Sequence, residues 1–369
     1  GELPHSFSGY GSSVAIAGNF IVAGEPGFAQ DRGRVYEYQR EPSTGVWSPS
    51  GSLIGLIDSE ALGSAVDLAA LPDGTTSMLV GAEDTRQPNF LRFGSATYYE
   101  FDPLTGQRSQ VGSTMLPEIQ ITETGGEFGG VVAMATDIRR VVIGAPSSSL
   151  DISNLNTGRV YTFEYDEDVG DWAPMADAIL GVRESFLGSA LDMSRDGSRI
   201  LAGAPLAFGG TGVANLYEWN GSTWIRLFRL TGELGQQMGT SVAFLNDDAS
   251  RIAFGGPGSD RGGEGIIRVY QDRGGFFQGF FESLGDGIVG LEGENIGKTL
   301  AGAGDRVAFG TDTGSFRVYE WMESQDTWLQ VATGPLNLGA AVVSISMSED
   351  AKTVVVGLAN EQVQVYNLE

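Results

Sequence analysis

Residues 186–224 read FLGSALDMSRDGSRILAGAPLAFGGTGVANLYEWNGSTW, and this stretch decides the fold. It contains four short apolar runs: Gly188–Met193, Ile200–Pro205, Asn215–Trp219 and Thr223–Ile225. Asp196-Gly197 separates the first two runs, and Asn220-Gly221 separates the last two. Both dipeptides tolerate the positive φ that tight hairpin turns require. The stretch therefore predicts a four-stranded antiparallel meander.

The same unit recurs seven times along the 369 residues. Its second predicted strand ends in a landmark glycine, and these glycines are about 55 residues apart, a spacing typical of repeat architectures. The landmarks are Gly24, Gly81, Gly144, Gly203, Gly255, Gly310 and Gly357. A first strand precedes each of them and begins at Gly11, Gly63, Gly129, Gly188, Gly239, Gly297 and Gly339. A third strand follows and carries Tyr36, Tyr98, Tyr161, Tyr217, Tyr270, Tyr319 and Tyr366.

The fourth predicted strand often opens with an aromatic residue. These aromatics are Trp47, Trp172, Trp224, Phe276-Phe277 and Trp328, and the second repeat has none. Large rings at a fixed place in each repeat favour packing between neighbouring units over stacking on a sugar. We expect them to wedge between blades.

Phe128-Gly129, Ile143-Gly144-Ala145-Pro146 and Gly158-Arg159-Val160-Tyr161 show the repeat most clearly. This pattern resembles the FG-GAP repeats of integrin α chains, and the resemblance covers essentially the whole sequence. It implies an all-β, seven-bladed β-propeller of four-stranded antiparallel blades. We expect one domain, residues 1–369, with blades at about 9–60, 61–126, 127–185, 186–236, 237–294, 295–336 and 337–369 plus 1–8.

The last repeat ends at Glu369, directly after its third strand. Leu3 precedes Gly11 at the distance at which Leu180 precedes Gly188. Residues 1–4 therefore look like the tail of a fourth strand, and we expect the N-terminal segment to pair with the last blade and close the ring. The alternative is an edge left open, to which a partner adds a strand.

The chain carries a formal net charge of −25 and contains no cysteine. Such an acidic chain repels nucleic acid and anionic membranes, so neither is an expected partner. Without cysteine there is neither a disulfide framework nor a thiolate metal site. No apolar run is long enough to span a membrane.

The resemblance implies calcium sites in the hairpins between first and second strands, within a run of the form D-x-D-x-D-G-x-x-D. The corresponding turns here lack three alternating acids: Leu71–Gly74, Ser194–Gly197, Asn246–Asp248 and Ser348–Asp350. We therefore expect no cofactor, and Ca²⁺ is a ligand that only the resemblance implies.

Asp67 and Asp192 lie in the innermost predicted strand, where the other repeats have Ala15, Ala133, Ala243, Ala301 and Val343. An unpaired buried carboxylate is costly. We expect both acids to face a water-filled axial channel, either as solvated carboxylates or as ligands of a metal ion.

Catalysis has little support in the sequence. His5 is the only histidine, which excludes a Ser–His–acid arrangement elsewhere in the chain. A pair of carboxylates that hydrolyses or eliminates remains an alternative, because their separation cannot be read from the sequence.

Binding is the better-supported activity. Long loops between second and third strands carry arginine and aromatic residues, which are enriched in protein interfaces. The candidate partner-binding residues are Phe28, Arg32, Arg86, Phe90, Arg92 and Arg261. We predict a non-catalytic scaffold that binds a protein partner, or joins a larger complex, through these loops or the open edge. A lectin-like, glycan-binding propeller is the alternative.

Asn220-Gly221-Ser222 matches an acceptor for N-glycosylation and is also the predicted hairpin turn. The structural role as a turn is the favoured one. With the resemblance, we expect a location outside the cell, at its surface, or in a secretory or organelle lumen, where the site would be usable.

Overall fold

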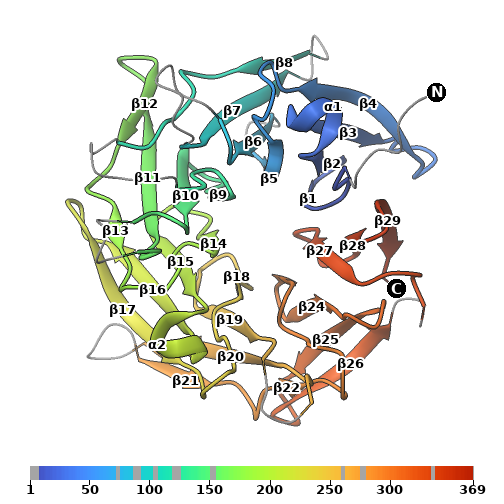
Figure 1. The fold of residues 1–369 in the computed structure, drawn as a ribbon. Coiled ribbons are helices and arrows are strands. Elements are labelled where there is room, and N and C mark those ends of the chain that lie inside the picture. Colours follow the sequence, from blue (N-terminus) through green and yellow to red (C-terminus); the bar gives the residue numbers. More distant parts are fainter. Residues whose placement is uncertain are drawn as a thin grey trace.

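The computed structural model shows seven antiparallel β-sheets arranged as blades around a central axis (Figure 1). It describes residues 8–71, 75–85, 93–102, 107–118, 126–149, 155–258, 262–274, 280–333 and 337–368. In every sheet the first four strands present follow one another in chain order, with the first strand nearest the axis, and in two sheets a short fifth strand also pairs with the third. The predicted all-β propeller class is confirmed.

The first four blades contain the following strands. Blade 1 contains β1 (Val14–Ala17), β2 (Phe20–Glu25), β3 (Arg34–Arg40) and β4 (Trp47–Ile54). Blade 2 contains β5 (Leu62–Ala70), β6 (Thr76–Ala82), β7 (Ser95–Asp102) and β8 (Gln107–Gln110). Blade 3 contains β9 (Val131–Met134), β10 (Arg140–Ala145), β11 (Arg159–Asp166), β12 (Asp171–Pro174) and the short β13 (Ile179–Leu180). Blade 4 contains β14 (Ala190–Met193), β15 (Arg199–Ala204), β16 (Val213–Trp219) and β17 (Trp224–Thr231).

The remaining three blades complete the ring. Blade 5 contains β18 (Ser241–Phe244), β19 (Arg251–Gly256), β20 (Ile266–Asp272), β21 (Phe281–Ser283) and the short β22 (Ile288–Val289). Blade 6 contains β23 (Leu300–Ala303), β24 (Arg306–Gly310), β25 (Phe316–Met322) and β26 (Thr327–Thr333). Blade 7 contains β27 (Val342–Met347), β28 (Thr353–Leu358) and β29 (Gln362–Asn367). Two short helices, α1 (Phe28–Asp31) and α2 (Ala207–Gly210), lie in loops of blades 1 and 4.

The landmark glycines let neighbouring blades approach each other. A Cβ on Gly203 would lie 1.9 Å from the carbonyl oxygen of Gly239, the first-strand glycine of the next blade. Gly239 has a φ of +89°, a conformation that L side chains rarely adopt. The same approach recurs at Gly24, Gly81, Gly144, Gly255 and Gly357. At these six contacts, a landmark glycine and the first-strand glycine of the next blade are both needed.

The first strand of the last repeat departs from this pattern. A Cβ on Gly310 would lie 2.4 Å from Val342, so Val342 occupies the place that a first-strand glycine takes in the other blades. Our assignment of Gly339 to that place was wrong, because the register of β27 against β28 is displaced by three residues from the register that Gly339 predicts. Ser344 is consequently the residue opposite Gly357, and Ser346 replaces Val343 as the counterpart of Asp67 and Asp192.

Hydrophobic clusters fill the spaces between adjacent blades throughout the described part of the chain. The tryptophans of the fourth strands join them, and three donate their indole N–H to the preceding blade. Trp172 donates to the carbonyl of Val111, and Trp224 to the hydroxyl of Thr162. Trp328 donates to the carbonyl of Leu284. These tryptophans wedge between blades, as predicted, whereas Phe276-Phe277 lie outside the described residues.

The ring closes through the contact between blades 7 and 1. A Cβ on Gly357 would lie 1.9 Å from the carbonyl oxygen of Gly11, and the hydroxyl of Ser344 donates to the same oxygen at 2.7 Å. The backbone N–H of Gly9 donates to Glu361 at 3.1 Å. In the described residues blade 7 has three strands. The predicted pairing of residues 1–4 with this blade lies outside the described part of the chain.

Candidate functional site

The two ends of the ring carry different connections. One end, here the loop face, holds the loops after the second and the fourth strand of each blade. The other end, the turn face, holds the hairpin turns after the first and the third strand. This division follows from the antiparallel order of every sheet.

On the loop face, the two loops of one blade support each other through backbone hydrogen bonds. Glu184 donates its N–H to the carbonyl of Leu155 at 2.9 Å in blade 3. Gln237 donates to Gly210 at 2.9 Å in blade 4, and Gly293 to Gly262 at 3.0 Å in blade 5. These loops are therefore fixed to a rigid scaffold, which is where proteins commonly place binding residues.

Large apolar side chains are exposed on the loop face of blades 3 to 5. Leu234 is 69% exposed, Leu291 64% and Phe208 54%. The others in these loops and at the strand ends beside them are Leu155, Leu180, Val182, Leu206 and Val289. We call this set the apolar loop surface. Single exposed apolar residues are ordinary, but a set of them on adjacent loops is characteristic of a binding surface.

Phe208 is held in an unusual conformation at this surface. Its φ of +54° and ψ of 44° lie in the left-handed region, which costs a non-glycine residue about 1 kcal/mol or more. The guanidinium of Arg229 lies 5.0 Å from the centre of its ring. Ala29 has a similar conformation in α1 of blade 1, so the conformation belongs to the turn, and the turn of blade 4 presents an aromatic ring there.

Of the six predicted partner-binding residues, the structure describes two. Phe28 is half-buried, with the guanidinium of Arg34 at 5.2 Å from its ring centre. Arg32 is exposed and forms an ion pair with Asp58, whose Oδ1 lies 2.6 Å from its Nε. Both are on the loop face of blade 1. The other four lie outside the described residues: Arg86, Phe90, Arg92 and Arg261.

The apolar loop surface is absent from the residues predicted to bind a partner. A signal for it exists, because a glycine follows the fourth strand and an exposed apolar residue comes next in three blades, at Gly55-Leu56, Gly181-Val182 and Gly290-Leu291. This signal lies in the connections between blades, whereas our candidates came mainly from the loops between second and third strands.

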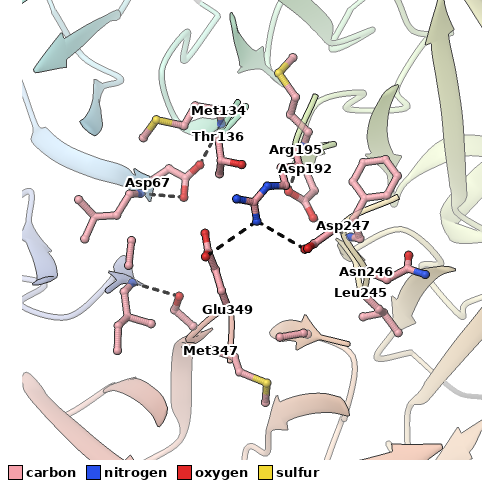
Figure 2. Close-up of a pocket in the computed structure, with 18 of the residues that line it drawn as sticks. Asp67, Met134, Thr136, Asp192, Arg195, Leu245, Asn246, Asp247, Met347 and Glu349 are labelled. Carbon is pink, nitrogen blue, oxygen red and sulfur yellow. Dashed lines mark hydrogen bonds and ion pairs between the residues drawn. The ribbon is translucent and has the colours of Figure 1, made fainter. Parts of the chain in front are cut away.

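Asp67 and Asp192 line a cavity of about 210 Å³ on the axis, as predicted (Figure 2). Each carboxylate accepts two backbone N–H groups. Asp67 accepts those of Leu68 and Met134, both at 2.9 Å. Asp192 accepts those of Met193 at 2.8 Å and Phe244 at 2.6 Å. The acids therefore join the innermost strands of adjacent blades, a role that the sequence analysis missed.

Ser346 performs the same role in blade 7, because its hydroxyl accepts the N–H of Ile16 in blade 1 at 3.3 Å. An innermost strand has a free edge toward the axis, and its amide groups need acceptors. Asp67, Asp192 and Ser346 together accept hydrogen bonds from five amide N–H groups of the innermost strands.

The environment raises the pKa of both carboxyl groups. Burial is the main cause at Asp67 and repulsion from Asp192 adds to it, so that its pKa rises to about 7 although the N–H groups of Met134 and Leu68 act in the opposite direction. Burial likewise raises the pKa of Asp192 to about 7. A neutral-range pKa for both acids makes this level of the channel sensitive to pH.

Arg195 lies across the turn-face mouth of the same cavity (Figure 2). Its Nε is 2.9 Å from Asp137 of blade 3, and its Nη1 is 3.6 Å from Asp247 of blade 5 and 4.0 Å from Glu349 of blade 7. The nearby acids hold its pKa above the usual value, and the hydrogen bond to Asp137 contributes most. One guanidinium thus links blade 4 to three others.

Two other acids of the first hairpin turns, Asp196 and Asp350, accept hydrogen bonds from their own turns. Asp196 accepts the hydroxyl of Ser194 at 2.7 Å and the N–H of Ser198 at 2.9 Å. Asp350 accepts the hydroxyl of Ser348 at 2.6 Å, and this bond is the first cause of its lowered pKa. Pro72, Asp73 and Gly74 of the blade 2 turn lie outside the described residues. Among the residues described, no three histidine or acidic side chains are grouped to hold a metal ion.

Asn220 lies in an exposed turn between β16 and β17. Its Oδ1 accepts the N–H of Ser222 at 2.9 Å and that of Thr223 at 2.8 Å. The amide nitrogen is left at the protein surface. The turn prediction for this dipeptide is confirmed.

Comparison with known proteins supports the fold and identifies no family. No helix in the described ranges is long and apolar enough to cross a membrane. No protein-family model and no curated protein matches the sequence. Among solved structures, the chain is similar to a chain in the crystal structure of the mitotic checkpoint complex, with a TM-score of 0.61, 12% identity, and coverage of 96% of this chain and 90% of that chain. At this identity the likeness establishes a shared architecture, and the protein is a seven-bladed β-propeller.

Proposed function

We propose that the protein is a non-catalytic interaction scaffold of the FG-GAP propeller type, which binds a partner protein through its loop face. The observation that carries the proposal is the apolar loop surface of blades 3 to 5. Loops that hydrogen-bond to one another hold it in place, so little order has to be gained on binding. The similar chain from the mitotic checkpoint complex is itself part of a protein assembly, which is consistent with this role.

The composition of the surface favours a protein over a glycan. Sugar faces stack on aromatic rings, and a propeller that binds glycans with each blade would show an exposed ring in each. In the described loops of blades 3 to 5, Phe208 is the single exposed aromatic, and the other exposed apolar side chains are aliphatic. Aliphatic side chains match the apolar core of a protein interface.

The outer edge of β29 offers a second mode of binding. In the described residues no strand pairs with this edge, and an extended segment of a partner would complete the blade by backbone hydrogen bonds. The two modes predict different consequences of mutation, because side chains of the loop face do not contribute to a strand edge in blade 7.

The test is co-purification from the native source, with quantitative mass spectrometry of bound proteins. The face variant Val182→Ser/Leu234→Ser/Leu291→Ser removes three exposed apolar side chains. The matched control, Val46→Ser/Val169→Ser, removes exposed apolar side chains from turns of the opposite face, where Val46 is 56% and Val169 73% exposed. We expect a stoichiometric partner that the face variant loses and the control retains. A partner retained by both variants would move the site to the edge of β29, and a protein with no partner at all would contradict the proposal.

We also propose that the protein acts outside the cell or in a secretory or organelle lumen. The support is the exposed Asn220 turn together with the FG-GAP resemblance. Material from the native source should lose mass on treatment with an N-glycosidase, and Asn220→Gln should abolish that change. An unglycosylated wild-type protein would remove this support.

A further inference from the structure

We infer that the partner segment is basic and apolar, with lysine or arginine side chains between the apolar residues that contact the apolar loop surface. This inference rests on the proposed function, since it specifies what the loop face binds. It depends on where carboxylates lie relative to the exposed apolar side chains.

Each of the three connecting loops places an acid within two residues of an exposed apolar side chain. The pairs are Val182 with Glu184, Leu234 with Glu233, and Leu291 with Glu292, and all six residues are exposed. Blade 1 repeats the arrangement, with Leu56 and Ile57 exposed beside Asp58. The repeat thus produces apolar and acidic groups side by side around one face.

These acids are weakly engaged by the protein's own cations. Glu184 pairs with its exposed neighbour Arg183 at 3.0 Å, and Glu233 lies 3.6 Å from Arg268. In the described part of the chain, Glu292 has no ion-pair partner. Exposed pairs of this kind contribute little to stability, so a cation from a partner can replace the arginine at small cost.

Charge also separates this partner from the other candidates. A second copy of the chain would bring an equal surface of apolar and acidic groups and another net charge of −25. An anionic membrane would meet the same repulsion, although the exposed leucines would suit it. A basic segment gains from both the apolar contacts and the acids, because charge complementarity accelerates association and excludes wrong partners.

Phe208 and Leu234 mark the expected centre of the contact. Both belong to blade 4, between the loops of blades 3 and 5, and their loops are joined by the hydrogen bond from Gln237 to Gly210. Binding energy usually concentrates in a few central side chains, with aromatic residues prominent among them.

The probe is a fluorescent amphipathic peptide of leucine and lysine, about 18 residues or five helical turns long. A second peptide has glutamate in place of every lysine. We expect the lysine peptide to bind, the glutamate peptide not to bind, and affinity to fall as ionic strength rises from about 0.05 M to about 0.5 M. Hydrogen exchange should show protection of residues 180–186, 206–211, 231–237 and 289–295.

Two variants separate the apolar contribution to binding from the electrostatic one. Leu234→Ser/Leu291→Ser should weaken binding about tenfold or more, and Glu184→Gln/Glu233→Gln/Glu292→Gln about fivefold at low ionic strength. The control Asp168→Asn/Asp247→Asn/Asp326→Asn removes the same charge from the turn face and should change affinity less than twofold.

Three outcomes would overturn the inference. They are equal binding of the two peptides, equal weakening by the control, and protection confined to the turn face. If the native partner still depends on the loop face in co-purification while the lysine peptide fails to bind, the scaffold function stands and the basic character of the partner is wrong. If neither the native partner nor the lysine peptide depends on the loop face, the inference fails and the site of the scaffold moves to the edge of β29.

Discussion

The axial channel and the loop face are formed by the same repeat, yet they differ in whether their side chains have partners within the protein. In the channel, Asp67, Asp192 and Ser346 accept amides of adjacent blades, and Arg195 joins four blades at one mouth. On the loop face, Leu234 and Leu291 are exposed beside Glu233 and Glu292. Groups that hold the ring together are already partnered, whereas groups on the loop face are available to another molecule. The comparison predicts that substitutions in the interior change stability, and that substitutions on the loop face change binding alone.

The largest effect is expected where two blades touch through glycine. Gly203→Ala places a Cβ 1.9 Å from the backbone oxygen of Gly239, and a backbone atom cannot rotate away. We expect a loss of about 3 kcal/mol or more, or failure to fold, since overpacking of an interior already costs about 1–3 kcal/mol. Gly51→Ala is the matched control in strand β4, because its nearest new contact is an ordinary 3.7 Å. Chemical denaturation measures both, and equal stability of the two variants would refute the role given to the landmark glycines.

The second effect concerns pH. The pKa of Asp67 and of Asp192 rises from 3.8 to about 7 on folding, so the folded state binds more protons than the unfolded state between these values. Stability should therefore fall as pH rises from about 4 to about 7 and change little through these groups above that range. We expect about 2 kcal/mol for the pair, a reduced figure because both side chains retain some contact with the channel. Asp67→Ala/Asp192→Ala should flatten the profile of Tm against pH. Glu349 and Asp247 face the same cavity and stay in place in this variant.

The same double variant tests the metal hypothesis. Because each carboxylate already accepts two amides, we expect millimolar Ca²⁺ to leave Tm unchanged in the wild type. A rise in Tm that the double variant abolishes would instead establish the two acids as metal ligands.

A smaller effect is expected at the mouth of the channel. Arg195→Ala leaves Asp137, Asp247 and Glu349 without their shared cation. These groups are partly exposed, so the loss should be about 1 kcal/mol and should shrink with added salt. Thermal unfolding at two salt concentrations measures it. A loss that is independent of salt would assign Arg195 a packing role in place of an electrostatic one.

The smallest effect on stability is expected on the loop face. Leu234→Ser should change the free energy of unfolding by at most about 0.5 kcal/mol, because its side chain is 69% exposed and fills no core. Its effect on partner binding should be much larger. A strongly destabilised Leu234→Ser protein would mean that the apolar loop surface supports the fold, and the contrast with the channel would disappear.

Much of the architecture was predictable because the same sequence pattern occurs seven times along the chain. Asp196-Gly197 and Asn220-Gly221 mark hairpins, and the tryptophans of the fourth strands lie between blades as expected. The register of the last repeat was not predictable from Gly339. Val342 takes the place of the first-strand glycine, and only its contact with Gly310 reveals that the register is displaced by three residues. The function of Asp67 and Asp192 was equally hidden, since their amide donors lie in the next blade, more than fifty residues away.

The sequence by itself determined the class of the protein and the number of repeats, because these depend on local turn chemistry and on glycine at fixed intervals. Only the tertiary structure decided which polar groups bond to other parts of the protein and which are exposed to another molecule. That distinction depends on closing the ring, which brings Gly357 to Gly11 and Arg195 to Glu349, and which places the loops of blades 3, 4 and 5 on one face. Partners that are distant in sequence meet only after closure, so no local pattern records them.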